Sequence, residues 1–422
     1  MKKMKPSGVE WIGDIPQEWE IALIKYSIKW KSEKGKPDAT VLSLYRDYGI
    51  VPKDSRDDNH NVTSLDTSGY KVVDIGDFVI NKMKAWQGSM AISSYKGIVS
   101  PAYHVCEITD DKVYRNYFHY LLRSDLYITE YTRLSKGMRI GQWDLDFNDF
   151  KNLPFLIPPI SEQQRIAEFL DRKCAEIDSI IGKTKATVEE YRALKQAVIT
   201  QAVTKGIRPD RPMKDSGIEW IGEIPQEWSK DKVFRSFSII GSGTTPKSSD
   251  DSNYEGNINW IQSGDINGEV LLSVKKHLSY EAVKEYSALR LYSSPFIVIA
   301  MYGASIGNLS ISEIDSCVNQ ACCVLAEPKI RIKYAFYSIK AAKDYLITKA
   351  VGGGQPNISQ DIVKSLWLPI PPVQEQQEIS DYLDSKCAEI DRLIAAKEQL
   401  LTELESYKKS VIYEYVTGKK EV

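Results

Sequence analysis

Residues 7–19, SGVEWIGDIPQEW, return almost unchanged as residues 216–228, SGIEWIGEIPQEW, 209 positions further along the chain. A second pair of segments repeats with an offset of 213, because PPISEQQ at residues 158–164 matches PPVQEQQ at residues 371–377. A unit of about half the chain is far longer than the roughly 20 to 50 residues of a solenoid or propeller repeat. The sequence therefore predicts two large copies of one structural unit.

The stretches between the repeated segments, residues 20–152 and 229–365, resemble each other only loosely. Both consist of short apolar runs separated by Gly, Asn, Asp and Ser, a pattern typical of strands and loops with a few helices. Their ends still match at the offset of 213, since Gly141-Gln142 corresponds to Gly354-Gln355. We expect an α/β protein with two globular heads that share a scaffold and differ in their interiors.

A long helix is predicted after each Pro-Pro pair, over residues 161–203 and 374–416. Each would have 43 residues and a length of about 64 Å at a rise of about 1.5 Å per residue. The segment KCAEID occurs in both helices, at residues 173–178 and again at 386–391. Gly182 stands where the second helix has Ala395, a substitution that costs a helix about 1 kcal/mol.

Apolar residues in these helices recur with alternating steps of three and four, which is the spacing of a coiled-coil seam. Because so much apolar surface is unstable when exposed, the simplest partner for one helix is the other, packed antiparallel as a pseudo-two-fold pair. Separate packing of each helix on its own head is the alternative. The predicted seam residues are Ile177, Ile181, Val188, Val198, Ile390, Ile394, Leu401 and Val411.

Composition limits the class of protein. The chain of 422 residues has 42% hydrophobic and 27% charged residues, values typical of a soluble globular protein with more than one domain. The basic start, MKKMK, leads into no apolar segment, and no apolar run is long enough to span a membrane, so we expect a cytoplasmic location and no membrane partner. A net charge of −2 argues against a protein that coats nucleic acid by charge alone.

No catalytic or metal site is predicted. The six cysteines form no C-x-x-C pair and the four histidines are scattered, so zinc-ligand spacing is absent and the cysteines are expected to be buried, reduced thiols. Gly182-Lys183-Thr184 lacks the upstream glycine of a phosphate-binding loop, and residues 241–246, GSGTTP, are better explained as a turn.

Polar and aromatic residues on predicted loops of both heads are candidates for contacts with base edges and phosphates. For any single one of them, an ordinary solvated or capping role is the competing interpretation. In the first head they are Tyr45, Arg46, Lys53, Arg56, Lys82, Lys84, Trp86, Gln87, Arg139 and Gln142. In the second head they are Thr244, Thr245, Lys247, Trp260, Gln262, Tyr302, Asn319, Gln320, Gln355 and Asn357.

The chain resembles the specificity subunit of type I restriction-modification systems over essentially its whole length. The resemblance rests on the duplicated SG[VI]EWIG[DE]IPQEW segment, on the Gly-Gln and Pro-Pro-x-x-Glu-Gln-Gln pattern that closes each variable stretch, and on the paired helices. Two segments of the second half, WIQSGDI at residues 260–266 and GASIG at residues 303–307, are also typical of the family's recognition domains.

The resemblance implies a division of labour within a complex. Each head would be a target recognition domain reading one half of a split, asymmetric site in double-stranded DNA, and the helices would set the spacing and dock two methyltransferase (modification) subunits. Motor-nuclease (restriction) subunits would complete the complex. S-adenosylmethionine, ATP and Mg²⁺ would be bound by those partners, so this chain would be non-catalytic and would hold no cofactor and no metal.

On this interpretation the chain divides into a first target recognition domain (1–152), a central helical spacer (153–207), a second target recognition domain (208–365) and a C-terminal helical spacer (366–422). Two alternatives belong to other classes of protein. One is a self-contained DNA methyltransferase or nuclease, which the absence of cofactor and metal motifs disfavours. The other is a two-headed tether that binds proteins.

Overall fold

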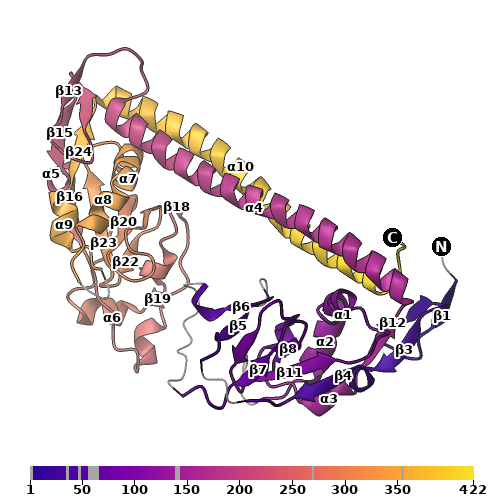
Figure 1. Cartoon of the computed structure of the whole chain (residues 1–422). Coiled ribbons are helices and arrows are strands. Elements are labelled where there is room, and N and C mark those ends of the chain that lie inside the picture. Colours follow the sequence, from indigo (N-terminus) through magenta and orange to yellow (C-terminus); the bar gives the residue numbers. More distant parts are fainter. Residues whose placement is uncertain are drawn as a thin grey trace. The chain divides into compact units, whose positions relative to one another are not determined.

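The computed structural model describes residues 3–34, 38–45, 49–55, 66–137, 143–268, 270–352 and 356–422. The chain forms two compact units (Figure 1). Unit 1 comprises residues 1–185 together with 399–422, and unit 2 comprises residues 186–398. Both long helices run through both units, so each unit contains a part of each helix.

Unit 1 contains a four-stranded antiparallel sheet with its helices following in sequence (Figure 1). The strand order is β4 (Ile28–Lys31), β11 (Tyr103–Ile108), β8 (Phe78–Asn81), β9 (Met90–Ile92). Two small ladders accompany it, β5 (Leu42–Tyr45) with β6 (Gly49–Pro52) and β7 (Lys71–Val73) with β10 (Gly97–Val99). The helices are α1 (Arg115–Leu122), α2 (Asp125–Leu134) and α3 (Phe147–Lys151), with the short turns η1 (Ile24–Tyr26), η2 (Lys53–Ser55) and η3 (Ala85–Gln87).

Unit 2 repeats this order with different lengths and additions. Its main sheet is β16 (Phe237–Gly241), β23 (Cys322–Pro328), β20 (Phe296–Ala300), β21 (Leu309–Ser312), extended by β18 (Val270–Leu271). A second sheet consists of β19 (His277–Leu278), β17 (Ile258–Ile261) and β22 (Ser316–Val318). The helices are α5 (Val233–Ser236), α6 (Tyr280–Glu285), α7 (Ile332–Ala341), α8 (Lys343–Thr348) and α9 (Gln360–Ser365), with η4 (Asp251–Tyr254) and η5 (Ser263–Asp265).

The repeated sequence segments adopt the same structure in both units. β1 (Met4–Pro6) pairs with β2 (Asp14–Pro16) as β13 (Met213–Asp215) pairs with β14 (Glu223–Pro225). β3 (Glu20–Leu23) pairs with β12 (Pro154–Ile157), and β15 (Ser229–Lys232) pairs with β24 (Trp367–Ile370). The tryptophan that ends each segment, Trp19 or Trp228, is buried in the core of its unit. The prediction of a mixed α/β protein built from two copies of one scaffold is confirmed.

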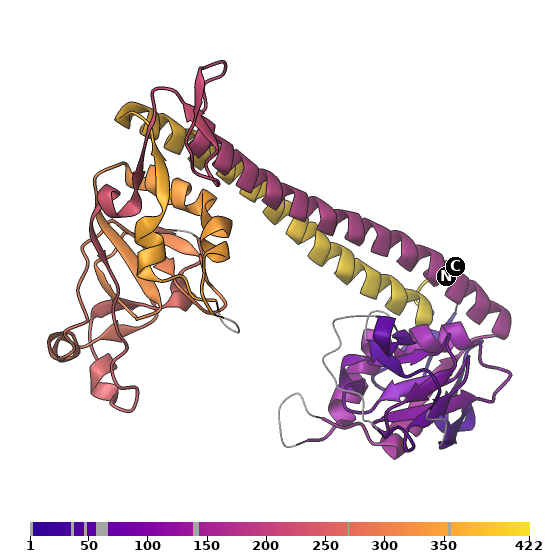
Figure 2. The ribbon, with the colours of Figure 1, turned by 60° about the vertical axis from the view of Figure 1, so that its left-hand side comes forward.

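The two predicted long helices are α4 (Ile160–Lys205, 46 residues) and α10 (Val373–Val416, 44 residues). α4 is continuous through Gly182, where an added Cβ would have no neighbouring atom within 4 Å. Within each unit the two helices lie side by side and antiparallel (Figures 1 and 2). Asp178 is 2.7 Å from Lys408 in unit 1, and Asp391 is 2.6 Å from Lys195 in unit 2. The prediction that the helices pack on each other is confirmed.

The heads also pack on the helices. Tyr117 donates a hydrogen bond to the Val416 carbonyl at 3.0 Å in unit 1, and Tyr334 donates one to the Val203 carbonyl at 3.2 Å in unit 2. Because 203 and 416 differ by the repeat offset of 213, this is one contact made twice. In each unit the core contains side chains of the head and of both helices. None of the helices in the part of the chain that the structure describes could cross a membrane.

Candidate nucleic-acid interface

In unit 2 most of the residues predicted to contact DNA lie at one end of the sheets. The backbone N–H of Asn319 donates to the Ile261 carbonyl at 3.0 Å, which places Asn319 beside Gln262. The hydroxyl of Thr245 donates to Oε1 of Gln320 at 2.6 Å. Three segments that follow or precede strands β16, β17 and β23 therefore meet, and they bring the polar residues Thr244, Thr245, Gln262, Asn319 and Gln320 together.

Close backbone packing makes this meeting possible. A Cβ at Gly243 would lie 1.8 Å from the Val318 carbonyl oxygen, so only glycine fits there. Residues 242–247 are neither helix nor strand, and only the 3-10 turn η4 (Asp251–Tyr254) follows closely, so the segment is a loop without the α-helix of a nucleotide cradle.

Two further predicted residues adjoin the same end of the main sheet. Tyr302 and Asn357 form an isolated antiparallel bridge just after β20. The neighbouring Met301 donates its amide to the Ala321 carbonyl at 2.8 Å and accepts from the Ile358 amide at 2.8 Å. Tyr302 and Asn357 are thereby joined to the Asn319–Ala321 segment. We name the set Thr244, Thr245, Gln262, Tyr302, Asn319, Gln320 and Asn357 the strand-end cluster.

The Asn319 side chain has a fixed orientation. Its Oδ1 accepts from the Ala321 amide at 3.1 Å and from the Cys322 thiol at 3.1 Å. An N–H group can be bound only by the oxygen of the amide, so Nδ2 must point the other way. Among the described residues Nδ2 has no hydrogen-bond partner, and it is therefore an oriented donor at the end of the sheet.

Two other predicted residues of unit 2 do not belong to this cluster. Trp260 is buried in the core against Tyr254, and its indole N–H has no hydrogen-bond partner among the described residues. Its ring is thus not exposed for base contact, because it packs in a core cluster with Leu278, Leu289 and Cys317. Lys247 is exposed, and its backbone amide donates to the Tyr286 hydroxyl.

In unit 1 four predicted residues follow strand β8. They are Lys82, Lys84, Trp86 and Gln87. Lys82 is 3.1 Å from a carboxylate oxygen of Asp144, and the Trp86 ring lies 5.1 Å from the Trp143 ring. Tyr45 and Lys53 lie on the hairpin β5–β6 and the turn after it, where they are half-buried. Arg46, Arg56, Arg139, Gln142 and Gln355 lie outside the described residues.

Sequence reasoning missed an aromatic surface on unit 1. Trp30 is 52% exposed, and its ring lies 5.6 Å from Phe147 and 6.3 Å from His104. Phe147 also lies 5.1 Å from His104. Trp30 and His104 are on adjacent strands, β4 and β11, so the only signal available was an aromatic residue in the polar context Lys-Trp-Lys.

Lysines and carboxylates both lie near this surface, since Lys71, Lys82, Asp144 and Asp146 all act on His104. Burial, together with the positive charges of Lys71 and Lys82, lowers the pKa of His104 to about 4. The imidazole is therefore neutral at neutral pH. Its Nδ1 is buried without a hydrogen-bond partner among the described residues, as is Oδ1 of Asp144.

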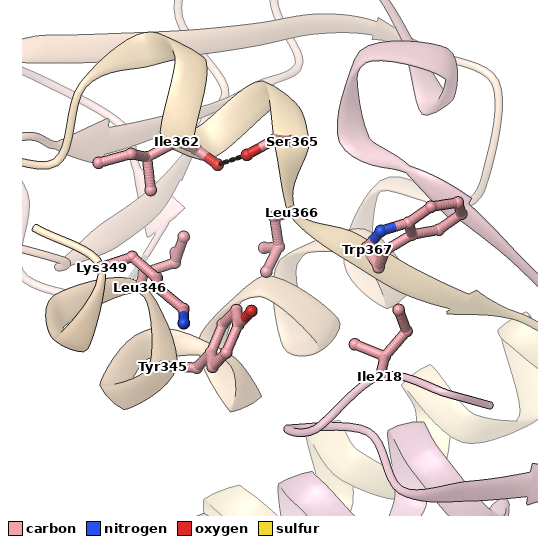
Figure 3. Close-up of a pocket in the computed structure, with 8 residues that line it drawn as sticks. All are labelled: Ile218, Tyr345, Leu346, Lys349, Ile362, Ser365, Leu366 and Trp367. Atoms are coloured by element: carbon pink, nitrogen blue, oxygen red, sulfur yellow. Dashed lines mark hydrogen bonds between the residues drawn. The ribbon is translucent and has the colours of Figure 1, made fainter. Parts of the chain in front are cut away.

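A separate pocket lies in unit 2 between α8, α9 and the start of β24 (Figure 3). It has a volume of about 300 Å³ and is lined by Ile218, Tyr345, Leu346, Lys349, Ile362, Ser365, Leu366 and Trp367. Most of these side chains are apolar, and none belongs to the strand-end cluster. The pocket therefore offers no grouping for chemistry on a bound molecule.

Within the described ranges no group of His, Cys, Asp or Glu side chains is arranged to hold a metal ion. All six cysteines are buried and unpaired. Burial raises the pKa of Cys106, Cys322 and Cys323 to about 12, so these thiols stay protonated and are poor nucleophiles at neutral pH.

Comparison with known proteins agrees with this description. The model of the type I restriction modification DNA specificity domain matches twice, at residues 27–190 and 226–406. The specificity subunit of the type I restriction enzyme MjaVIII from Methanocaldococcus jannaschii is 25% identical over 96% of this chain and 93% of its own length.

Two solved structures share the fold. A chain from a structural study of complex assembly and conformational transition in the type I R-M system has a TM-score of 0.74 at 16% identity, covering 96% of this chain and 99% of its own. The HsdS subunit from Thermoanaerobacter tengcongensis has a TM-score of 0.52 at 16% identity, covering 96% and 98%. With two family domains that span most of its length, the chain belongs to the type I restriction-modification DNA specificity family and is the DNA target-specificity subunit of such a complex.

Proposed function

We propose that each unit reads one half of a bipartite, asymmetric target in double-stranded DNA. The helices α4 and α10 set the number of base pairs between the half-sites and dock two modification subunits, and restriction subunits join that core. Specificity subunits are the non-catalytic components of these enzymes, and the cofactors reside on the modification and restriction subunits.

The observation that best supports an asymmetric target is the pairing of one scaffold with two different surfaces. The main sheets of both units have the same strand order, β4-β11-β8-β9 and β16-β23-β20-β21. Unit 2 places amides and hydroxyls at the end of its sheets, whereas unit 1 places lysines and aromatic rings on its surface. Equivalent positions with different hydrogen-bonding groups select different bases.

Asn319 is our leading candidate for base contact in unit 2. Its Oδ1 is occupied, so the side chain cannot form the bidentate pair that a free asparagine makes with adenine. Its Nδ2 suits a single acceptor, such as O6 or N7 of guanine or O4 of thymine in the major groove. Gln320, whose Oε1 accepts from Thr245, has its own Nε2 in a similar situation.

The helices expose apolar side chains in a duplicated pattern. Ile180 and Leu194 on α4 are 47% and 49% exposed, and Leu393 and Tyr407 on α10 are 43% and 51% exposed. The repeat offset of 213 relates Ile180 to Leu393 and Leu194 to Tyr407. Two copies of one exposed apolar pattern suit two copies of one partner, which supports one modification subunit docking on each unit.

The antiparallel packing of α4 and α10 groups these residues into one patch per unit. In unit 1 the ion pair Asp178–Lys408 brings Ile180 and Tyr407 to the same level of the helix pair. In unit 2 the ion pair Lys195–Asp391 does the same for Leu194 and Leu393. We call these two patches the helix patches of units 1 and 2.

A gel-shift comparison tests the proposal. The chain alone, with its net charge of −2, is expected to bind duplex DNA weakly. Addition of the modification subunit should produce a tight, sequence-specific shift, because the partner contributes further contacts with phosphates. Equal, sequence-independent binding in both cases would contradict the proposal.

A further inference from the structure

Unit 1 contains a like-charge pair across neighbouring segments. Lys34 and Lys71 are partners in an isolated antiparallel bridge, so their side chains leave the backbone on the same face. Like charges directly opposite each other destabilise a sheet. Lys71 is also only 8% exposed, which is rare for a lysine without an ionic partner.

The surroundings of Lys71 add to this unfavourable charge. Its amine donates to the Tyr103 carbonyl at 2.5 Å and lies 5.9 Å from the centre of the Trp30 ring. Burial, followed by the charges of Lys34 and Lys82, lowers the pKa of Lys71. In the described part of unit 1, neither Lys71 nor Lys34 forms an ion pair with a carboxylate, and Lys82 alone has one, with Asp144.

From this geometry we propose that Lys34, Lys71 and Lys82 form a binding site for a backbone phosphate of the DNA. A phosphate oxygen would accept from the lysine amines and would neutralise a positive cluster in which Asp144 pairs with Lys82 only. The proposal rests on the proposed DNA-reading function and adds where unit 1 holds the strand. We name the three residues the lysine cluster.

DNA suits the lysine cluster better than a free anion does. The exposed ring of Trp30 lies directly beside Lys71, and Phe147 and His104 continue the aromatic surface. A small inorganic anion would use only the amines, whereas a DNA strand would also cover the apolar rings. His104 stays neutral there, so it adds no charge of its own.

Replacement of Lys71 also has an expected effect on the melting temperature of the free protein. If Lys71 is kept for binding, its replacement by methionine removes a buried like charge and should leave the melting temperature of the free chain unchanged or higher. If Lys71 is instead structural, loss of its hydrogen bond to the Tyr103 carbonyl should lower the melting temperature.

The decisive experiment measures DNA affinity of the complex with the modification subunit at several salt concentrations. The variants are Lys71→Met and Lys34→Met, with Lys25→Met as control because Lys25 is an exposed lysine of unit 1 whose amine donates to Asn152. We expect each cluster variant to weaken binding and to reduce the slope of log K against log salt by up to about 0.9 per lost phosphate contact. The methylated sequence should not change.

Three results would overturn the proposal. The first is an unchanged affinity and salt slope in both cluster variants, and the second is a changed target sequence. The third is inorganic phosphate that binds at the lysine cluster without changing the salt slope of DNA binding, because DNA would then not use the site. Failure of the DNA-reading function itself would appear differently, as a parent complex without any sequence-specific methylation.

Discussion

At the scale of single residues, Asn319 offers the sharpest test of base recognition. Asn319→Asp keeps an oxygen that accepts from the Ala321 amide but turns the free donor into a charged acceptor. A wrong contact to a base costs about 1 to 3 kcal/mol, so we expect a loss of methylation at the parent target of about 5-fold to 150-fold, or an altered base in one half-site. Methylome sequencing measures both.

Gln226→Glu is the matched control, because Gln226 is exposed in unit 2 and the substitution adds the same negative charge. It should leave the target unchanged. Normal methylation by a folded Asn319→Asp variant would remove Asn319 from the interface.

His104 predicts a pH dependence of stability. Its folded pKa of about 4 lies below the ordinary value of 6.5, so between these two values the unfolded chain binds more protons than the folded one. The free energy of unfolding should therefore fall as pH is lowered from 6.5 to 4. His104→Phe, which suits the contacts with Trp30 and Phe147, should show a smaller fall in urea titrations. An identical pH dependence in parent and variant would contradict this assignment.

Individual residues were only partly predictable. Thr244, Thr245, Gln262, Asn319 and Gln320 were predicted as polar residues on loops, and the structure brings these loops together. The lysine cluster was not predictable, because Lys34 and Lys71 meet only through a pairing of segments far apart in sequence. The prediction that Trp260 contacts DNA was wrong, since its aromatic ring packs in the core.

At the scale of elements, the long helices were the most predictable part. Their apolar periodicity is local, and the structure extends the predicted bounds by only a few residues. The predicted seam residues divide into buried ones, Ile177, Val188, Ile390 and Val411, and half-buried ones, Ile181, Val198, Ile394 and Leu401. Their role as the contact between the helices stays a proposal. Strand order could not be predicted, because β-pairing is non-local.

The helix patches predict the stoichiometry of the complex. Ile180→Asp with Tyr407→Asp changes only the patch of unit 1, and each charge in an apolar contact costs up to several kcal/mol. We expect one modification subunit to bind in place of two, with both units still folded. Light scattering after gel filtration measures the mass. Glu190→Gln with Glu403→Gln, two exposed positions related by the repeat offset, is the control. A variant that still binds two subunits would show that docking occurs elsewhere.

The helices also predict the spacing of the half-sites. Insertion of four residues after Thr184 and of four after Lys397, positions related by the offset of 213, lengthens both helices by about 6 Å while keeping them matched. Because DNA rises about 3.4 Å per base pair, the unspecified spacer should change by about one or two base pairs. Methylome sequencing reads the spacer length. An active variant with the parental spacer would locate the ruler in the partner subunits.

At the scale of the whole molecule, duplication explains both what the units share and how they differ. The ion pairs Asp178–Lys408 and Asp391–Lys195 are the same contact in two copies, as are the tyrosine bonds to Val416 and Val203. The duplication could be predicted from the sequence because the residues that make these contacts are repeated. The surfaces proposed to read DNA could not be predicted in the same way, since they lie in the stretches where the copies differ.

The central claim is that each unit reads its own half-site. Exchange of residues 20–152 for the corresponding stretch of a relative with a different target replaces the interior of unit 1 and leaves unit 2 intact. Methylome sequencing of a host with the parent or the exchanged chain, each with the same modification subunit, compares the two targets directly. We expect one half-site to change and the other half-site to be identical. A change in both half-sites, or in neither, would contradict the account.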